Sequence, residues 1–243
     1  MKNFKNKVAV ITGGNSGIGY ATAKELKEKG VHVIITGRRK EAVEKAASAI
    51  NVIGMVADQT NLEDIDRLIS EVAKQFGKVD ILLINAGISQ FAPIEAMEEK
   101  MFDDIMNVNV KGAYFTLSKF IPILNENASV VLLSSTAAST PSPNISVYSA
   151  SKAAVNAIVK VAALELASRK IRVNAVSPGP IATEIMDKSG ISDPKTQEHI
   201  LNGIPLARFG NPTEVAKLMA YLSGSDAAFI TGSEFIIDGG QSI

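Results

Sequence analysis

The chain has 243 residues, 46% of them apolar, and its 25 basic side chains balance 25 acidic ones. A chain of this length fits one hydrophobic core. The balanced charge argues against nucleic acid or anionic lipid as a partner, because it gives no long-range positive field. The absence of cysteine excludes disulfides and thiol nucleophiles and suits a reducing compartment, so we expect a cytoplasmic protein.

Neither a metal site nor a membrane segment is expected. The two histidines, His32 and His199, are far apart in the sequence, and no carboxylate cluster has the spacing of metal ligands. Residues 1–7 are polar, and the apolar run that follows is interrupted at Gly13 and Gly14, well before the length of a signal peptide or a membrane span.

Apolar runs and amphipathic stretches alternate along the chain. The apolar runs contain few polar residues, which indicates strands buried on both faces. The β–α–β order predicts a single α/β domain of the Rossmann type, with a doubly wound seven-stranded parallel sheet and helices on both faces. We expect strands at residues 8–11, 31–36, 52–56, 79–84, 130–133, 171–176 and 234–237. We expect helices at residues 18–29, 41–50, 62–76, 147–168 and 213–223, and a bent helix pair within residues 98–124.

Residues 178–212 are the one long stretch without clear periodicity, and they contain several prolines and glycines. In a doubly wound fold such excursions follow the carboxyl ends of strands, where ligands bind. We therefore expect a substrate lid at residues 184–212.

A glycine-rich segment, residues 12–19 (TGGNSGIG), connects the first expected strand to the first expected helix. Glycines there allow a tight turn and let backbone N–H groups approach a pyrophosphate, whose charge the helix dipole favours. The spacing of Gly13, Gly17 and Gly19 departs from the common Gly-x-Gly-x-x-Gly fingerprint and lacks the Gly-Lys-Ser/Thr ending of a P-loop. A plain glycine-rich turn is the alternative, but the strand–loop–helix context favours a phosphate site.

Tyr148 and Lys152 stand four residues apart at the start of an expected helix, so they share one helix face. A free tyrosine has a pKa of about 10, and lowering that pKa to near neutrality requires about 4 kcal/mol. A lysine charge about 4 Å away supplies roughly this energy at an effective dielectric constant of 20. We therefore expect Tyr148 to transfer protons, with its pKa lowered by Lys152.

The same spacing occurs at Tyr20 and Lys24, which gives the sequence an internal control. Tyr20 directly follows the glycine-rich segment and has no companion serine, so we expect a packing or surface pair. Ser135, in contrast, ends a buried strand and places a hydroxyl at the carboxyl edge of the sheet near Tyr148. Ser134 is the weaker candidate, because adjacent strand residues point to opposite faces.

Two further groups of polar residues lie near expected strand ends. Asn85, Ala86 and Gly87 close the strand at residues 79–84. Asn109 lies in an expected helical stretch, where a buried asparagine usually serves a specific hydrogen bond or a kink. For Asn109, the sequence does not choose between the hydrogen bond and the kink.

Together these motifs resemble the short-chain dehydrogenase/reductase family over almost the whole chain, and their order and spacing carry the likeness. The chain is also similar to the 3-oxoacyl-acyl-carrier-protein reductases of this family. The resemblance implies that Ser135 orients the substrate carbonyl, Tyr148 transfers the proton and Lys152 holds the nicotinamide ribose. It also implies that Asn109 holds a water that relays protons from Lys152.

The resemblance also implies a nicotinamide cofactor. Its pyrophosphate would lie on the glycine-rich segment, its adenine by Asp58, and its carboxamide against Ile181 and Thr183. Gln59 stands where the family usually has an aliphatic residue, so the details of adenine packing are open. The expected cofactor-binding residues are Gly13, Asn15, Ser16, Gly17, Ile18, Gly19, Gly37, Arg38, Asp58, Asn85, Ala86, Gly87, Tyr148, Lys152, Pro178, Gly179, Ile181 and Thr183.

The end of the second expected strand favours NADP(H) over NAD(H). Enzymes that use NAD(H) usually have a carboxylate near this position for the ribose 2′-hydroxyl, and it would repel a 2′-phosphate. Here Gly37 leaves room and Arg38 supplies positive charge. Ser16 argues the other way, because many NADP-specific relatives carry a basic residue at this loop position, so NAD(H) remains the alternative.

We expect an oxidoreductase acting on CH–OH groups, which passes hydride between NAD(P)(H) and a carbonyl or alcohol, with a 3-oxoacyl-acyl-carrier-protein reductase-like ketoreductase as the named activity. A nucleotide-sugar epimerase or dehydratase would need a larger C-terminal domain and another glycine spacing. A non-catalytic NADP(H)-binding regulator would not need Ser135, Tyr148 and Lys152 together.

The expected helix also predicts an assembly of several chains. Residues 153–164 are apolar around most of the helix and, with the family resemblance, predict a homotetramer or homodimer.

Overall fold

The structure is a computed structural model that describes residues 4–184 and 193–243. Its centre is a sheet of seven parallel strands in the order β3-β2-β1-β4-β5-β6-β7. This order confirms the predicted doubly wound Rossmann-type sheet. The strands are β1 (Val8–Thr12), β2 (His32–Gly37), β3 (Ile53–Val56), β4 (Val79–Ile84), β5 (Leu124–Leu133), β6 (Arg172–Pro178) and β7 (Glu234–Ile237).

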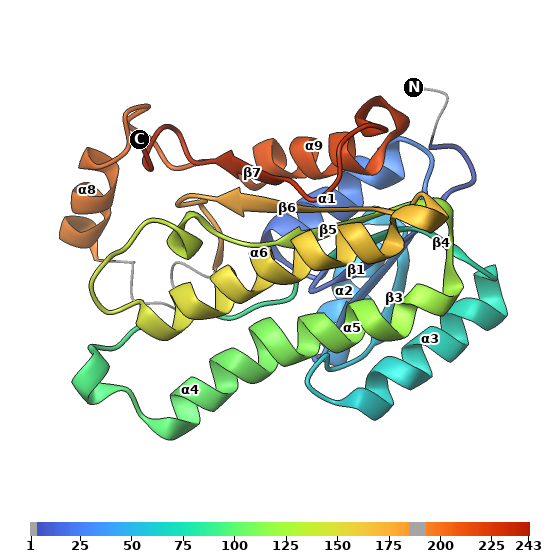
Figure 1. The fold of residues 1–243 in the computed structure, drawn as a ribbon, viewed down its shortest axis with the longest axis horizontal. Coiled ribbons are helices and arrows are strands. Elements are labelled where there is room, and N and C mark those ends of the chain that lie inside the picture. The colour runs from blue at the N-terminus through green and yellow to red at the C-terminus, as the bar shows by residue number, and fades with distance from the viewer. Residues whose placement is uncertain (1–3, 185–192) are drawn as a thin grey trace.

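Helices cover both faces of the sheet, as Figure 1 shows. One face carries α1 (Gly17–Glu28), α2 (Lys40–Ile50) and α9 (Pro212–Ser223). The other carries α3 (Leu62–Phe76), α4 (Glu99–Met106), α5 (Ala113–Phe120) and α6 (Ser146–Leu166). The remaining helical elements are η1 (Ile94–Ala96), η2 (Asn107–Gly112), η3 (Ile121–Ile123), η4 (Thr136–Ala138), η5 (Ala167–Arg169), α8 (Pro194–Asn202) and η6 (Ser225–Ala227).

Two apolar clusters form the core, one on each face of the sheet. In β1, Val8 and Val10 belong to the cluster under α3, α5 and α6, whereas Ala9 and Ile11 belong to the cluster under α1, α2 and α9. Successive strand residues therefore enter different clusters and all are buried. This explains why the strands read as continuous apolar runs, and why the sheet could be recognised in the sequence.

The expected bent helix pair within residues 98–124 is instead one helical run through α4, η2 and α5 (Figure 1). The middle part, η2, is a π-helix. A π-helical turn accommodates an extra residue without breaking the helix, and such turns are frequent at functional sites. The polar and glycine residues that suggested a bend thus mark this π-helix, which contains Asn109.

Strand β5 begins at residue 124, well before the expected start at residue 130. Its pairing with β4 shifts register between Val79 and Ile81, and Asn127 adopts a left-handed conformation with φ of 62°. The polar residues of this irregular part interrupt the apolar run in the sequence, which is why its first half was missed.

The described part of residues 178–212, which show no clear periodicity in the sequence, contains the helix α8. Asp193 caps it by accepting a hydrogen bond from the Thr196 N–H, and Pro194 occupies its first turn. This cap-and-proline signal is a known helix start, but the helix is short and too polar for a clear apolar stripe. Residues 185–192 of the expected lid lie outside the described residues, and the lid itself remains a prediction.

One helical stretch in the described residues, Ser146–Arg169, is long and apolar enough to cross a membrane by length and composition alone. In the structure its residues Val155, Val159 and Ala162 are buried against the sheet in the cluster shared with α3 and α5. A helix that packs on a sheet core has the same composition, and the catalytic candidates lie at its start.

Candidate active site

The carboxyl ends of the parallel strands meet at one edge of the sheet. There the glycine-rich segment follows β1, Asn85 follows β4, Ser135 follows β5, and Pro178 ends β6. The sheet order changes direction between β1 and β4. Open α/β sheets bind ligands beyond their strands at such a switch point, so the expected site residues gather where the topology places a ligand.

The glycine-rich segment forms a tight turn between β1 and α1. Gly13 and Gly17 have φ of 63° and 53°, a conformation that other residues rarely adopt. Ser16 is extended and caps α1 without a side-chain hydrogen bond, so its hydroxyl leaves the first N–H groups of α1 to other acceptors. Ile18 is partly buried against the adjoining core and anchors the start of α1.

Asn85 ties the loop after β4 to this turn. Its Nδ2 donates to the carbonyls of Thr12 and Gly13 at 3.0 and 3.2 Å. The Thr12 hydroxyl oxygen accepts from the backbone N–H groups of Asn85 and Ala86, both at 3.0 Å. A Cβ on Gly19 would lie 2.5 Å from both Asn85 Nδ2 and the Gly13 carbonyl oxygen. The turn is therefore rigidly joined to β4, and only glycine fits at position 19.

The end of β2 is shaped by Gly37 and Asn15. A Cβ on Gly37 would meet Asn15 Oδ1 at 2.4 Å, so no side chain fits there unless Asn15 moves. Arg38 follows with an exposed side chain, and it has no hydrogen bond or ion pair with any residue that the structure describes. With Asn15 in place, this corner therefore leaves no room for a carboxylate at position 37, and it presents the Arg38 guanidinium without a partner among the described residues.

Tyr148 and Ser135 face each other across the site. The pKa of Tyr148 is raised because burial disfavours the phenolate, and a hydrogen bond with Ser135 offsets part of this effect. Ser135 Oγ also accepts from the Ala137 N–H at 3.2 Å. Phe91 packs edge-on against the Tyr148 ring, with 6.0 Å between ring centroids. Phe91 was not singled out in the sequence, because no motif distinguishes it there.

Lys152 is buried and lies beside Tyr148. Its Nζ donates to the Leu133 carbonyl at 2.9 Å and lies 5.8 Å from the Tyr148 ring centroid. Burial lowers the pKa of Lys152 to about 8. The expectation that Lys152 lowers the pKa of Tyr148 is therefore wrong. Desolvation of the phenol dominates, and the Lys152 ammonium lies over the ring with its hydrogen bond directed to the Leu133 carbonyl.

Of the two roles that the sequence left open for Asn109, a specific hydrogen bond or a kink, the structure shows the hydrogen bond. It lies in the π-helix η2, and its Oδ1 accepts from the Ile88 N–H at 2.9 Å. Its Nδ2 donates to the Ile88 carbonyl at 2.9 Å and to Ser151 Oγ at 3.1 Å. A Cβ on Gly87 would lie 3.2 Å from Asn109 Oδ1 and 3.5 Å from Lys152 Nζ. Gly87 thus lets Asn109 and Lys152 approach the same loop.

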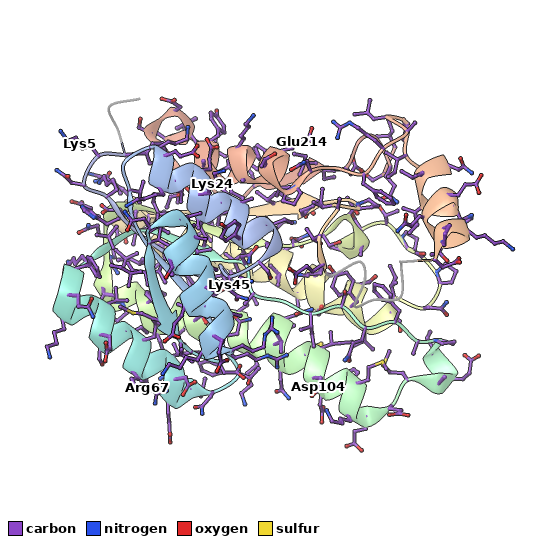
Figure 2. The ribbon with its side chains drawn as sticks, turned by 180° about the vertical axis from the view of Figure 1, so that it is seen from behind. Lys5, Lys24, Lys45, Arg67, Asp104 and Glu214 are labelled. Carbon is purple, nitrogen blue, oxygen red and sulfur yellow. The ribbon has the colours of Figure 1, made fainter. Side chains whose placement is uncertain are left out.

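Ser134 and the Tyr20–Lys24 pair, which the sequence made weaker candidates, lie outside the site. Ser134 is buried, and its hydroxyl donates to the Lys152 carbonyl at 3.2 Å, so it joins β5 to α6. Tyr20 is partly buried against the core under α1, whereas Lys24 is exposed. Figure 2 shows Lys24 on the outer side of α1. The Tyr20–Lys24 pair is therefore a packing and surface pair, as expected.

The segment after β6 reaches back to the glycine-rich turn. Gly179 donates its N–H to the Ile237 carbonyl at 3.0 Å, and a Cβ on Gly179 would lie 2.7 Å from Asp238 Cβ. Ile181 forms a parallel β-bridge with Gly210. The Thr183 methyl group lies 3.4 Å from where a Cβ on Gly17 would be. Thr183, which is expected to hold the nicotinamide carboxamide, and Gly17, which is expected to hold the pyrophosphate, are thus neighbours. The Pro178 carbonyl accepts from the hydroxyl of Thr136, the residue after Ser135, at 3.4 Å.

Asp58 follows β3, and its Oδ1 accepts from the N–H and hydroxyl of Thr60 at 2.9 and 2.8 Å. The adjacent Gln59 is buried, and its amide donates to two backbone carbonyls, those of Ala86 and Val108. This connection was not foreseen. The signal was a polar residue at a position where the family usually has an aliphatic one.

In residues 4–184 and 193–243, no three His, Cys, Asp or Glu side chains come together in a way that could hold a metal ion. The side chains that the structure brings together at this site carry hydroxyl, amide and ammonium groups.

Comparisons with known proteins point to one family. A family model described as enoyl-(acyl carrier protein) reductase matches residues 13–242. The 3-oxoacyl-[acyl-carrier-protein] reductase FabG of Staphylococcus aureus is 37% identical over 243 residues, which cover 97% of this chain and 98% of the relative. Dehydrogenase/reductase SDR family member 4 of Bos taurus is 35% identical over 244 residues, which cover 97% of this chain and 87% of the relative.

A solved structure is similar to this chain over nearly its whole length. The crystal structure of 3-ketoacyl-(acyl-carrier-protein) reductase from Brucella melitensis complexed with NADH has a TM-score of 0.92 and 35% identity to this chain, covering 99% of this chain and 100% of that one. The chain belongs to the short-chain dehydrogenase/reductase family. It is thus an oxidoreductase that acts on CH–OH or keto groups with a nicotinamide cofactor.

Proposed function

We propose that this protein is an NADP(H)-preferring ketoreductase that reduces 3-oxoacyl thioesters, with Asn109, Ser135, Tyr148 and Lys152 as its catalytic residues. The observation that carries the proposal is the meeting of Ser135 and Tyr148 at the carboxyl edge of the sheet, beside the glycine-rich turn and the buried Lys152. The similarity to two 3-oxoacyl-acyl-carrier-protein reductases over nearly the full chain supports the substrate class.

The described residues fit a nicotinamide dinucleotide. The turn at Gly13 and Gly17 offers backbone N–H groups at the start of α1, and Gly19 keeps side chains out of it. Thr183 closes over the same turn from the β6 side. Asp58 keeps one carboxylate oxygen, Oδ2, outside its Thr60 contacts, which suits an amino group of adenine.

The cofactor, when bound, supplies the hydride, and the chain supplies the proton and the orientation. Ser135 donates a hydrogen bond to the substrate carbonyl oxygen and so holds it beside Tyr148. As negative charge develops on that oxygen, Tyr148 gives it a proton. The raised pKa of Tyr148 keeps the phenol protonated at neutral pH, which suits the reductive direction. Lys152, with a pKa of about 8, carries its positive charge at neutral pH and binds the ribose hydroxyls.

The preference for NADP(H) rests on the corner at the end of β2. Position 37 cannot take a carboxylate while Asn15 keeps its place, and Arg38 is exposed and without a partner among the described residues. A guanidinium pairs well with a phosphate group. The Brucella relative is complexed with NADH, so the two cofactors have to be compared directly.

The experiment also tests enoyl thioester reduction, because the matching family model is described as an enoyl reductase. Ser135 and Tyr148 place two hydroxyl groups side by side, where they can bind and protonate the carbonyl oxygen of a ketone. An enoyl thioester also presents a carbonyl oxygen, so the experiment compares both substrates. The experiment follows NADPH oxidation with acetoacetyl, longer 3-oxoacyl and 2-enoyl thioesters, and with simple ketones. Reduction of the enoyl thioester alone would overturn the proposed substrate class, and NADPH binding without any turnover would favour a regulator.

We also propose a cytoplasmic homotetramer, with a homodimer as the smaller alternative. On α6, Val161 and Leu164 are 54% and 80% exposed, and on α5 Tyr114 is 50% exposed. These apolar side chains face away from the sheet on neighbouring helices, where a second copy of the chain would bury them.

A further inference from the structure

Gln59 connects three parts of the site that are distant in the sequence. It follows Asp58 in the segment between β3 and α3 and is 8% exposed. Its Nε2 donates to the Ala86 carbonyl at 2.9 Å and to the Val108 carbonyl at 2.8 Å. One acceptor lies in the loop after β4 and the other in the π-helix η2. Both hydrogens of one primary amide are thus used to join two elements.

Each of these bonds gives a backbone carbonyl next to the site a hydrogen-bond partner. A buried carbonyl without a hydrogen bond is unfavourable, and a π-helix shifts the normal pairing of carbonyls within the helix. An aliphatic side chain at position 59 could fill the same space but could donate nothing. The amide, and not the volume, is therefore the distinctive property of this residue.

The packing around Gln59 leaves little freedom. A Cβ on Gly112, at the end of η2, would lie 2.8 Å from the Gln59 carbonyl oxygen and 2.9 Å from its Cγ. Glycine at position 112 thus makes room for Gln59 against the π-helix. The side-chain Oε1 of Gln59 is enclosed and has no hydrogen-bond partner among the described residues, so donation by Nε2 is the only polar function that the structure gives this side chain.

The two carbonyls that Gln59 binds stand next to the catalytic centre. Val108 directly precedes Asn109, whose side chain holds Ile88 and Ser151. Ala86 directly precedes Gly87, which lies against Asn109 and near Lys152 Nζ. On its other side, Gln59 follows Asp58. The amide therefore fixes the position of the catalytic centre relative to the segment that carries Asp58.

We propose that Gln59 is a positioning residue that sets the π-helix carrying Asn109 and the loop carrying Gly87 in register with the Asp58 segment, so that cofactor binding and the catalytic geometry depend on its side-chain amide. This inference rests on the proposed function. Gln59 acts through Asn109 and Asp58 and itself contacts neither substrate nor cofactor.

The test uses Gln59→Met, which keeps the length and removes the donor, and Gln59→Leu, which introduces an aliphatic residue. Gln75→Met is the matched control, because Gln75 is exposed on α3. The three readouts are amide hydrogen exchange, NADPH affinity measured by cofactor fluorescence without substrate, and kcat with acetoacetyl thioester.

In both Gln59 variants we expect amides of residues 107–113 to exchange about tenfold faster than in the original protein, because the π-helix loses an anchor. We expect kcat to fall about tenfold through misplacement of the catalytic groups, and NADPH affinity to fall several-fold. Gln75→Met should change none of these.

If the Gln59 variants lose thermal stability but keep the original exchange in residues 107–113, the original kcat and the original NADPH affinity, Gln59 is a packing residue and the inference is overturned. If Gln59→Met fails to fold, Gln59→Leu decides. Failure of the original protein to bind NADPH or NADH would instead reject the proposed function, so the two failures are distinguishable.

Discussion

The two tyrosine–lysine pairs of this chain have the same spacing and opposite surroundings. Tyr148 and Lys152 lie in the first turns of α6, next to the carboxyl ends of β4 and β5. There Tyr148 forms a hydrogen bond with Ser135, and Lys152 donates to the Leu133 carbonyl. Tyr20 and Lys24 lie on α1, and Lys24 is exposed on its outer side (Figure 2). Spacing of four residues on a helix is therefore enough to place a tyrosine beside a lysine. Only polar groups from the neighbouring strand ends make such a pair a candidate reactive site.

The largest expected effect separates the two tyrosines. Tyr148→Phe removes the transferable proton with little change in shape, so turnover of a ketone with saturating NADPH should fall by about 10²–10⁴. Tyr20→Phe should change stability or binding by no more than about 1 kcal/mol. Steady-state turnover of both variants checks this, and equal losses in the two would show that the pairs are not distinguished by their surroundings.

The two lysines should differ in a similar way. Lys152→Met removes the charge that binds the ribose, and we expect a loss in kcat/KM of about 10²; Lys24→Met should leave kcat/KM unchanged. Because burial lowers the pKa of Lys152 to about 8, the ammonium loses its proton as the pH rises through about 8. The kcat/KM for ketone reduction in the original protein should therefore fall above this pH. A kcat/KM that stays level up to pH 10 would contradict the assignment.

The pH dependence of folding stability tests the lowered pKa of Lys152 independently of catalysis. In the unfolded chain Lys152 has its ordinary pKa near 10.5, above its pKa of about 8 in the folded protein. Between these values the unfolded state binds more protons, so this group makes the free energy of unfolding rise with pH. Comparison of the original protein with Lys152→Met by denaturant unfolding at pH 7.5 and pH 10 measures it. A difference between the two proteins that does not change with pH would contradict the lowered pKa.

Arg38, at the end of β2, should affect the choice of cofactor and not the transfer of the proton. Arg38→Ala should weaken NADPH binding by roughly 1.5–3 kcal/mol through loss of a charge-assisted contact, and NADH binding should change little. Arg39→Ala, which removes an equal charge one position later, is the control. Tighter binding of NADH than NADPH by the original protein would refute the preference.

The smallest effect concerns assembly. Leu164 is 80% exposed on α6, and burial of such a side chain contributes about 1.5–3 kcal/mol per copy. Leu164→Glu should therefore shift the assembly toward smaller species, measured by light scattering at micromolar concentration, with little change in monomer unfolding. A single species of about 26 kDa for the original protein would dismiss the tetramer and dimer together.

The sequence alone determined the sheet and most of its helices, because strands buried on both faces leave continuous apolar runs and surface helices leave stripes. It also separated Ser135 from Ser134, because strand geometry alternates side chains between faces. Features with weak local signals were missed, among them the first half of β5, which contains polar residues in an irregular pairing, and the short helix α8.

Only the tertiary structure decided how the site residues affect one another. The pKa of Tyr148 depends on the burial of its phenol, Lys152 directs its charge to the Leu133 carbonyl, and Asn109 both occupies a π-helix and binds a loop. Gln59 likewise joins residues 27 and 49 positions away. Desolvation and hydrogen bonding of this kind arise between segments distant in the chain, and so the local pattern of residues carries no record of them.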